Sequence, residues 1–163
     1  MWFPMQPSEL GFVESAPDRI EASSICPAPP ARVFEVLADP STWPQWFDDM
    51  RDTRWTSEKT ACVGAVRRAT LGLGIFDERI IAWEPGARFS FSIDGASVPL
   101  AKRVVEDWRL SPADGDKTKL EWAMLVDPSL PARLVKPILV YMMRRMFRRS
   151  SEGLARYLAP PPA

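Results

Sequence analysis

The sequence contains no histidine among its 163 residues, and this absence excludes several classes of chemistry. Ser–His and Cys–His catalysis, His-ligated zinc and proton shuttling by imidazole all need that side chain. Gly-rich phosphate loops, Walker motifs, CxxC pairs and EF-hand spacing are also missing. We therefore expect no metal and no cofactor, and any acid–base reaction must use carboxylates, Cys, Tyr, Lys or water.

Few cysteines, balanced charge and short apolar runs limit the partners and the location of the protein. Cys26 and Cys62 are too few for a disulfide framework, so we expect two buried free thiols. Basic and acidic residues number 21 each, which argues against a nucleic-acid partner. The first residues lack the pattern of a signal peptide, and the longest apolar run, around 138–143, is far shorter than the ~20 residues that span a bilayer. These features favour a soluble, cytoplasmic protein.

The placement of prolines predicts one domain between two tails. Residues 1–17 carry three prolines without a periodic pattern, and residues 159–163 include three consecutive prolines. We expect both segments to be loosely held. Residues 18–158 then form the single domain expected for a chain of this size, and a hydrophobic fraction of 46% suffices for a core, or for a core with a hole in it.

A first strand at 19–26 and two short helices are predicted before the remaining strands. The proline pair at 29–30 suits a first helical turn, whose N–H groups have no partners. The Asp-Pro pair at 39–40 ends this helix, because the residue before a proline avoids the α conformation. A second short helical element, with two tryptophans one turn apart, follows up to residue 46.

The middle of the chain predicts a series of antiparallel strands. Short segments rich in Gly, Pro and Asp separate runs with β character, and short turns between consecutive strands imply an antiparallel meander. The predicted strands are 51–56, 65–71, 75–83, 88–93, 102–110 and 119–126.

The period changes after residue 130, where an amphipathic helix is predicted over Pro131–Leu158. Its apolar residues share one helical arc and its arginines lie on the opposite arc. Pro137 falls within the first two turns, where it bends the helix or delays its start.

The order of strand, two short helices, six strands and a long helix resembles the helix-grip fold of the START-like (SRPBCC) superfamily. The branch of polyketide cyclases/dehydrases and lipid transport proteins is the most similar, over roughly residues 20–158. The resemblance implies an α+β fold in which a curved antiparallel sheet of about seven strands wraps around the C-terminal helix and leaves a cavity for a small ligand. The local matches are Ala28–Pro40 with Trp43 and Trp46, Glu78–Ile80, Trp83–Gly86, Glu106–Leu110 and Leu120–Trp122.

Two carboxylates are candidate functional groups of such a cavity. Glu106 shares a strand face with Trp108 and Leu110, which indicates that it points inward. Glu78 shares a face with Phe76, but competing apolar residues in its strand indicate a bulge. Burial would raise the pKa of an inward carboxyl group and suit it to general acid catalysis or to orienting a ligand. The alternative is a structural ion pair with an arginine such as Arg68, Arg79 or Arg103.

Large apolar side chains on the inward faces are candidates for the lining of the cavity, and ordinary core packing is the alternative for each of them. With the two carboxylates, the predicted ligand-binding residues are Trp46, Phe76, Glu78, Phe91, Glu106, Trp108, Trp122, Met142 and Met146.

Three functions are compatible with these features. The first is binding or transport of a small hydrophobic or aromatic ligand, lipid-like or polyketide-like. The second is a cyclase or dehydratase that uses Glu106 and Glu78 as acid and base. The third is docking on a membrane or an acidic partner through the basic helix face, with weak contact to anionic lipid. That face comprises Arg144, Arg145, Arg148 and Arg149.

Overall fold

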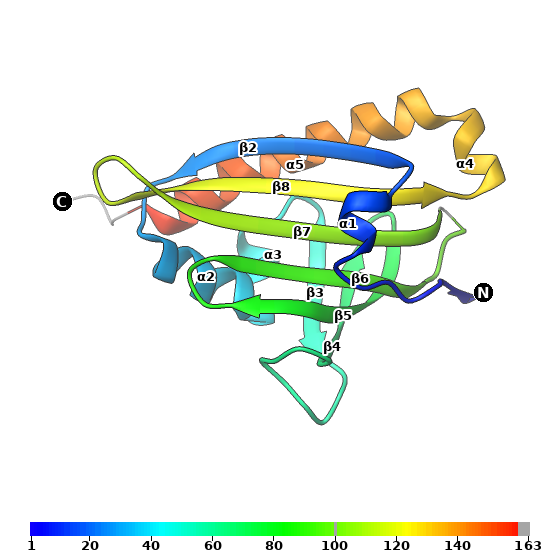
Figure 1. The fold of residues 1–163 in the computed structure, drawn as a ribbon, viewed down its shortest axis with the longest axis horizontal. Coiled ribbons are helices and arrows are strands. Elements are labelled where there is room, and N and C mark those ends of the chain that lie inside the picture. Colours follow the sequence, from blue (N-terminus) through cyan, green and yellow to red (C-terminus); the bar gives the residue numbers. More distant parts are fainter. Residues whose placement is uncertain (100, 160–163) are drawn as a thin grey trace.

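The computed structural model describes residues 1–99 and 101–159 and has the predicted α+β architecture, an antiparallel sheet with a long C-terminal helix against it (Figure 1). Within the expected C-terminal tail, residues 160–163 lie outside the described residues. Along the sheet the strands are β2 (Asp18–Cys26), β8 (Lys117–Pro128), β7 (Ala101–Ala113), β6 (Arg88–Ala96), β5 (Gly74–Glu84), β4 (Val66–Leu71) and β3 (Met50–Trp55).

All neighbouring strands are antiparallel, and each of the seven predicted strands is present with slightly different ends. The bulge predicted in β5 is confirmed, because the pairing of β5 with β6 shifts register between Asp77 and Glu78 and again between Ile80 and Ala82. A two-residue strand, β1 (Phe3–Pro4), also pairs with β6.

The two short helices follow β2 as predicted. They are α2 (Pro30–Ala38) and α3 (Trp43–Trp46), joined by the 3-10 turn η1 (Pro40–Thr42). The Asp39 side chain ends α2 and begins η1 by accepting a hydrogen bond from the Ser41 backbone N–H at 2.9 Å. The Trp43 indole donates to the Leu37 carbonyl at 2.9 Å, which fixes α3 against α2 at one end of the sheet (Figure 1).

The C-terminal helix is divided, which differs from the continuous helix predicted over Pro131–Leu158. A short α4 (Leu130–Leu134) and a long α5 (Lys136–Leu158) meet at Val135, where φ is −108° and ψ is 14°. Pro137 explains the break, because its ring and its missing N–H disfavour continuation of the helix that precedes it. Figure 1 shows the resulting corner, with α4 turned away from the direction of α5.

The N-terminal segment is ordered against the sheet, although its sequence predicts a loosely held tail. Backbone hydrogen bonds join Met5 to Asp94 at 3.0 Å and Gln6 to Lys102 at 2.9 Å. The one-turn helix α1 (Phe12–Ser15) then lies on the face of the sheet opposite to α5 (Figure 1). Its two buried residues complete a small outer core, whose members are Phe12, Val13, Ile81, Val105, Ala123 and Leu125.

The larger core lies on the inner face of the sheet, beneath α2, α3 and α5. The Trp122 ring stacks on Phe147 of α5 with 4.3 Å between ring centroids, and Trp43 packs edge-on against Trp108. Helix α5 approaches α3 so closely that a Cβ on Gly153 would lie 2.1 Å from the Trp46 carbonyl oxygen. Glycine at this position therefore permits the close approach of the long helix to α3.

Candidate functional site

An apolar cavity of about 210 Å³ lies between the inner face of the sheet and the first half of α5. Strand side chains such as Phe76, Ile93 and Met124 form its floor, while Met143 and Met146 of α5 cover it. Towards its C-terminal end α5 packs closely on α3, where a Cβ on Gly153 would lie 2.1 Å from the Trp46 carbonyl oxygen, and the cavity lies beneath its first half.

Glu106 of β7 is the buried carboxylate in the middle of this face, with 6% of its surface exposed. Its Oε2 atom accepts hydrogen bonds from the indole N–H groups of Trp122 at 2.9 Å and Trp108 at 3.2 Å. No hydrogen-bond donor among the described residues contacts the Oε1 atom of Glu106. One oxygen is thus held by the protein, and the other is available to a molecule in the cavity.

The surroundings of Glu106 also disfavour its ionised form. Burial raises the pKa of Glu106 to about 7, and the nearby charge of Glu78 adds to this shift. The hydrogen bonds from the two indoles and the charge of Arg67 act in the opposite direction. Near neutral pH the carboxyl group therefore exists in both forms, and it can either donate or accept a hydrogen bond.

Glu78 of β5 lines the same cavity but is held by a buried arginine. The Arg67 Nε atom donates to Glu78 Oε2 at 2.6 Å, and the Arg67 side chain has no exposed surface. The Arg67 guanidinium carbon lies 4.1 Å from the centroid of Trp43 and 4.8 Å from that of Phe91. Burial raises the pKa of Glu78, although Arg67 opposes that shift.

The arginine that pairs with Glu78 is none of the three partners that the sequence suggested. Arg68 instead binds Asp77 at 2.7 Å, Arg79 binds Asp94, and Arg103 donates to Gln6. These three side chains lie outside the inner face, so none of them reaches either cavity carboxylate. Sequence reasoning missed Arg67, but strand parity contained the signal, because buried Ala65 and Ala69 flank Arg67 at alternate positions.

Asp107 follows Glu106 in the chain, but its carboxyl group has a different environment because it lies on the opposite face of the strand. It lies on the outer face of β7, where Arg88 donates to it at 2.7 Å and Ser90 also donates. Burial pushes the pKa of Asp107 upward, but the hydrogen bonds from Arg88 and Ser90 outweigh it and the pKa is lowered. Two consecutive acidic residues are thus shifted in opposite directions.

The structure brings five of the nine predicted ligand-binding residues to the cavity surface. They are Phe76, Glu78, Phe91, Glu106 and Met146. Trp108 and Trp122 lie behind Glu106 as hydrogen-bond donors, and Trp46 packs between α3 and α5. Met142 is 44% exposed, because it lies on the side of α5 that faces away from the sheet.

Residues outside the predicted ligand-binding set complete the site. Met5 reaches the cavity from the N-terminal segment, and Trp43 lines it beside the Arg67 guanidinium. At the rim, Lys136 of α5 pairs with Asp18 of β2, and Leu73 in the turn after β4 is 39% exposed. The exposed rim residues mark where the cavity reaches the surface.

Three further observations concern metals, membranes and cysteines. In residues 1–99 and 101–159, no group of three or more His, Cys, Asp or Glu side chains is arranged to hold a metal ion. No helix in the same part of the chain has the length and apolar character needed to cross a bilayer. Both cysteines are free as predicted, but only Cys26 is fully buried; Cys62 is partly exposed, which corrects the expectation of two buried thiols.

Comparison with known sequences identifies relatives along most of the chain. Residues 17–159 match the protein family described as polyketide cyclase/dehydrase and lipid transport. Uncharacterised proteins of Mycobacterium tuberculosis and Mycobacterium bovis are 33% identical over 151 residues, which is 90% of this chain and 90% of theirs.

Solved structures share the fold at low sequence identity. A START superfamily protein from Mycobacterium smegmatis matches with a TM-score of 0.74 and 12% identity, over 86% of this chain and 96% of that one. The ZhuI aromatase/cyclase from Streptomyces sp. R1128 matches with a TM-score of 0.73 and 16% identity, over 86% of this chain and 93% of that one. At these identities the likeness shows the helix-grip fold alone.

Proposed function

Since this chain belongs to the polyketide cyclase/dehydrase and lipid transport family, we propose that it binds a small hydrophobic or aromatic ligand in the cavity between the sheet and α5. The observation that carries this proposal is a largely apolar cavity lined by the Glu106 carboxyl group, one oxygen of which accepts no hydrogen bond from the described residues. Apolar burial, at about 25 cal/mol per Å², supplies most of the affinity, and Glu106 orients the ligand.

The volume of the cavity favours a compact ligand. A cavity of about 150 Å³ lined by aliphatic and aromatic side chains already accommodates benzene. About 210 Å³ therefore suits one or two fused rings, or a short aliphatic chain, better than a complete phospholipid. A carbonyl or hydroxyl group on that ligand matches Glu106, because this carboxyl group can both donate and accept near neutral pH.

Calorimetric titration with 2-naphthol and with naphthalene tests this proposal. We expect saturable, equimolar binding of both molecules, and weaker binding of 2-naphthol but not of naphthalene in Glu106→Gln. Met124→Trp fills the floor of the cavity and should abolish binding, whereas Ile25→Trp, at a position 53% exposed on β2, should not. Binding that does not saturate, or that survives Met124→Trp, would exclude the cavity as the site.

Native mass spectrometry of protein purified gently from its own host complements the titration. A defined extra mass that disappears on denaturation would identify the carried molecule directly. We expect an adduct in the size range of one or two rings and its loss in Met124→Trp.

A second candidate function is proton transfer on a bound carbonyl compound, as in a cyclase or dehydratase. It is favoured by two carboxyl groups that line one cavity, with the pKa of Glu106 at about 7. As a base, the carboxylate removes a proton from the carbon next to a carbonyl and leaves an enolate. Returning a proton to that carbon restores the ketone.

Deuterium exchange into 1-tetralone, followed by NMR in D₂O, tests this second candidate without knowledge of the natural substrate. Catalysis predicts faster exchange with the protein than in buffer, and loss of that acceleration in Glu106→Gln. If 1-tetralone binds and its exchange rate equals that in buffer, the cavity binds without this chemistry.

A further inference from the structure

Helix α4 and the first half of α5 expose an unusual concentration of large apolar side chains. Within the part of the chain that the structure describes, twelve large hydrophobic residues are exposed, and six of these lie between residues 130 and 142. Scattered single apolar residues are normal on protein surfaces, but a cluster indicates a contact surface. The six are Leu130 (73% exposed), Leu134 (87%), Val135 (44%), Ile138 (61%), Tyr141 (65%) and Met142 (44%).

Positive charge is concentrated in the same segment. Residues 130–149 contain six basic and no acidic residues, so the remainder of this neutral chain has a net charge of −6. Arg144, Arg145 and Arg148 are exposed, and none of them has an ion-pair partner among the described residues. By contrast, the nearby Arg149 lies 3.8 Å from Asp48.

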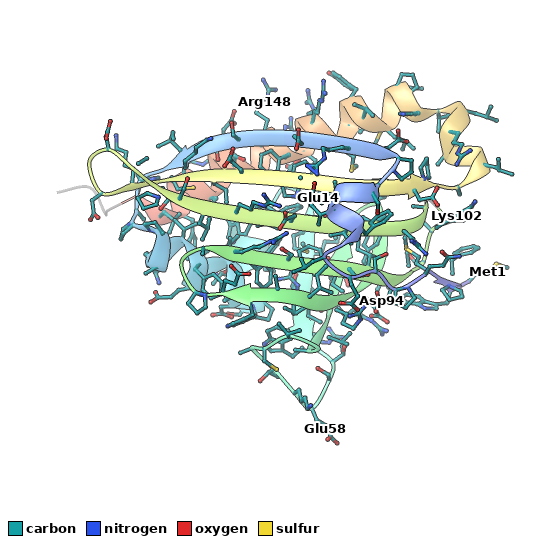
Figure 2. All side chains as sticks on the ribbon, viewed as in Figure 1. Met1, Glu14, Glu58, Asp94, Lys102 and Arg148 are labelled. Carbon is teal, nitrogen blue, oxygen red and sulfur yellow. The ribbon has the colours of Figure 1, made fainter. Side chains whose placement is uncertain are left out.

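Within α5 the exposed apolar and basic residues lie on one side of the helix, because packing fixes the other side; the exposed residues Leu130, Leu134 and Val135 precede it in α4 and at the junction. Met143 and Met146 of α5 line the cavity, and Phe147 is buried against the sheet. Figure 2 shows the Arg148 side chain extending outward, beyond the edge of the sheet. We call this solvent-facing set the outer helix face; it comprises the six exposed apolar residues with Arg144, Arg145 and Arg148.

We propose that the outer helix face docks on an anionic lipid bilayer. The α4–α5 corner inserts its apolar side chains between headgroups, and the arginines about two and a half to three and a half turns beyond Val135 bind lipid phosphates. A helix with exposed apolar residues and basic neighbours has the composition of interfacial membrane-binding helices. Tyr141 adds an amphipathic ring of the kind enriched at membrane interfaces.

Charge separation within the chain also favours an anionic surface. The acidic remainder of the molecule is repelled by such a surface, so only the 130–149 segment is attracted and the orientation is fixed. Nucleic acid and acidic proteins share the negative charge, but neither accounts for six exposed apolar side chains next to the arginines. A bilayer accounts for both sets, since it offers phosphates and hydrocarbon at one surface.

Docking in this orientation would bring the cavity to the membrane. Lys136 and Val140 line the cavity from the first turns of α5, whose other side carries Ile138 and Tyr141. A ligand dissolved in the bilayer would then reach the cavity rim without crossing water. This consequence rests on the proposed function, whereas the docking itself does not.

Co-sedimentation with vesicles tests the proposal on the full chain without any ligand. Vesicles of phosphatidylcholine alone are compared with vesicles containing phosphatidylglycerol, at low and at high salt. We expect binding to the anionic vesicles at low salt and its loss at high salt, because exposed charges are screened. Each basic residue near an anionic surface changes partition about fivefold, so Arg144→Gln with Arg145→Gln should weaken it about thirtyfold.

Matched variants separate surface docking from a general loss of charge or of structure. Arg51→Gln with Lys59→Gln removes two exposed basic residues elsewhere and should leave partition unchanged. Leu134→Ser with Ile138→Ser should weaken binding, whereas Val63→Ser, at a position 58% exposed, should not. All these changes are on the surface, and circular dichroism checks that each variant is folded.

Three results would overturn the proposal. They are absence of binding to anionic vesicles at low salt, equal losses in the outer-face and control variants, and equal binding to neutral vesicles. Failure of 2-naphthol binding with vesicle binding intact would reject the proposed ligand and leave the docking in place. The two inferences are therefore tested separately.

Discussion

The Arg67 Nε atom donates to Glu78 Oε2 at 2.6 Å, at a place where neither side chain exposes more than 6% of its surface. The two terminal nitrogens of Arg67 are buried without a hydrogen-bond partner in the described part of the chain. The rings of Trp43, Phe89 and Phe91 surround the guanidinium and stabilise its charge through their faces. The pair thus places two compensating charges beside a cavity that is lined mainly by apolar side chains.

Removal of Arg67 should destabilise the protein strongly. Arg67→Met leaves the Glu78 carboxylate buried without its partner, and breaking a buried pair in this way costs about 3–5 kcal/mol. The double variant Arg67→Met with Glu78→Leu should recover part of that loss, since no charge is left uncompensated. Urea unfolding at pH 7 measures the free energy of unfolding of the single and the double variant. A double variant less stable than the single one would contradict the expected cost of an unpaired buried charge.

Glu106→Gln should stabilise the protein at high pH and have little effect at low pH. The folded-state pKa of about 7 lies above the ordinary value of 4.5, so folding favours the protonated form. The resulting penalty is absent below pH 4.5, grows as the pH rises, and is complete above pH 7. Between pH 5 and pH 8 the advantage of the glutamine variant should grow by about 2.5 kcal/mol.

Urea unfolding of the wild-type protein and of Glu106→Gln at these two pH values gives the difference between their free energies of unfolding. Asp107→Asn serves as the control, because the pKa of Asp107 is lowered and its variant should lose stability at both values. A glutamine variant with the same advantage at both pH values would show that the pKa of Glu106 is not raised.

Gly153→Ala should destabilise the protein, although alanine is ordinarily the better helix former by about 1 kcal/mol. The added Cβ would lie 2.1 Å from the Trp46 carbonyl oxygen, which is backbone and cannot rotate away. Helix α5 must shift, at a cost of about 1–3 kcal/mol. Thermal unfolding shows whether Gly153→Ala lowers or raises the melting temperature, and Ser151→Ala in the same helix is the control. A higher melting temperature for Gly153→Ala would refute the close approach of α5 to α3.

One of the two cysteines should react with a thiol reagent in the native state. Cys26 has no exposed surface, and burial raises the pKa of its thiol to about 11, so little thiolate forms at pH 8. Cys62 is partly exposed. Titration with Ellman's reagent should give one equivalent in buffer and two in guanidinium chloride. The native signal should vanish in Cys62→Ser and persist in Cys26→Ser.

The order of the elements is what the sequence by itself determined. Local rules sufficed for this, because Pro29 and Pro30 fix a helix start, Asp39 precedes a proline, and turn residues separate the strands. Strand parity also assigned Glu106 to the inner face, since Glu106, Trp108 and Leu110 lie at alternate positions of β7 and beyond its register shift at residues 101–103. These features depend on neighbours within a few residues, so they can be read without knowledge of the fold.

Contacts between distant segments were decided only by the tertiary structure. The partner of Glu78 is Arg67 and not Arg68, Arg79 or Arg103, because the pairing register of β4 with β5 places residues 67 and 78 side by side. The N-terminal segment carries no periodic signal, yet it is ordered, since strand β6 and the outer core provide the partners for its backbone and for Phe12. The cavity likewise depends on how α5 lies over the sheet, with its C-terminal part packed on α3 at Gly153 and its first half above the cavity, and no local pattern encodes the placement of a helix on a sheet.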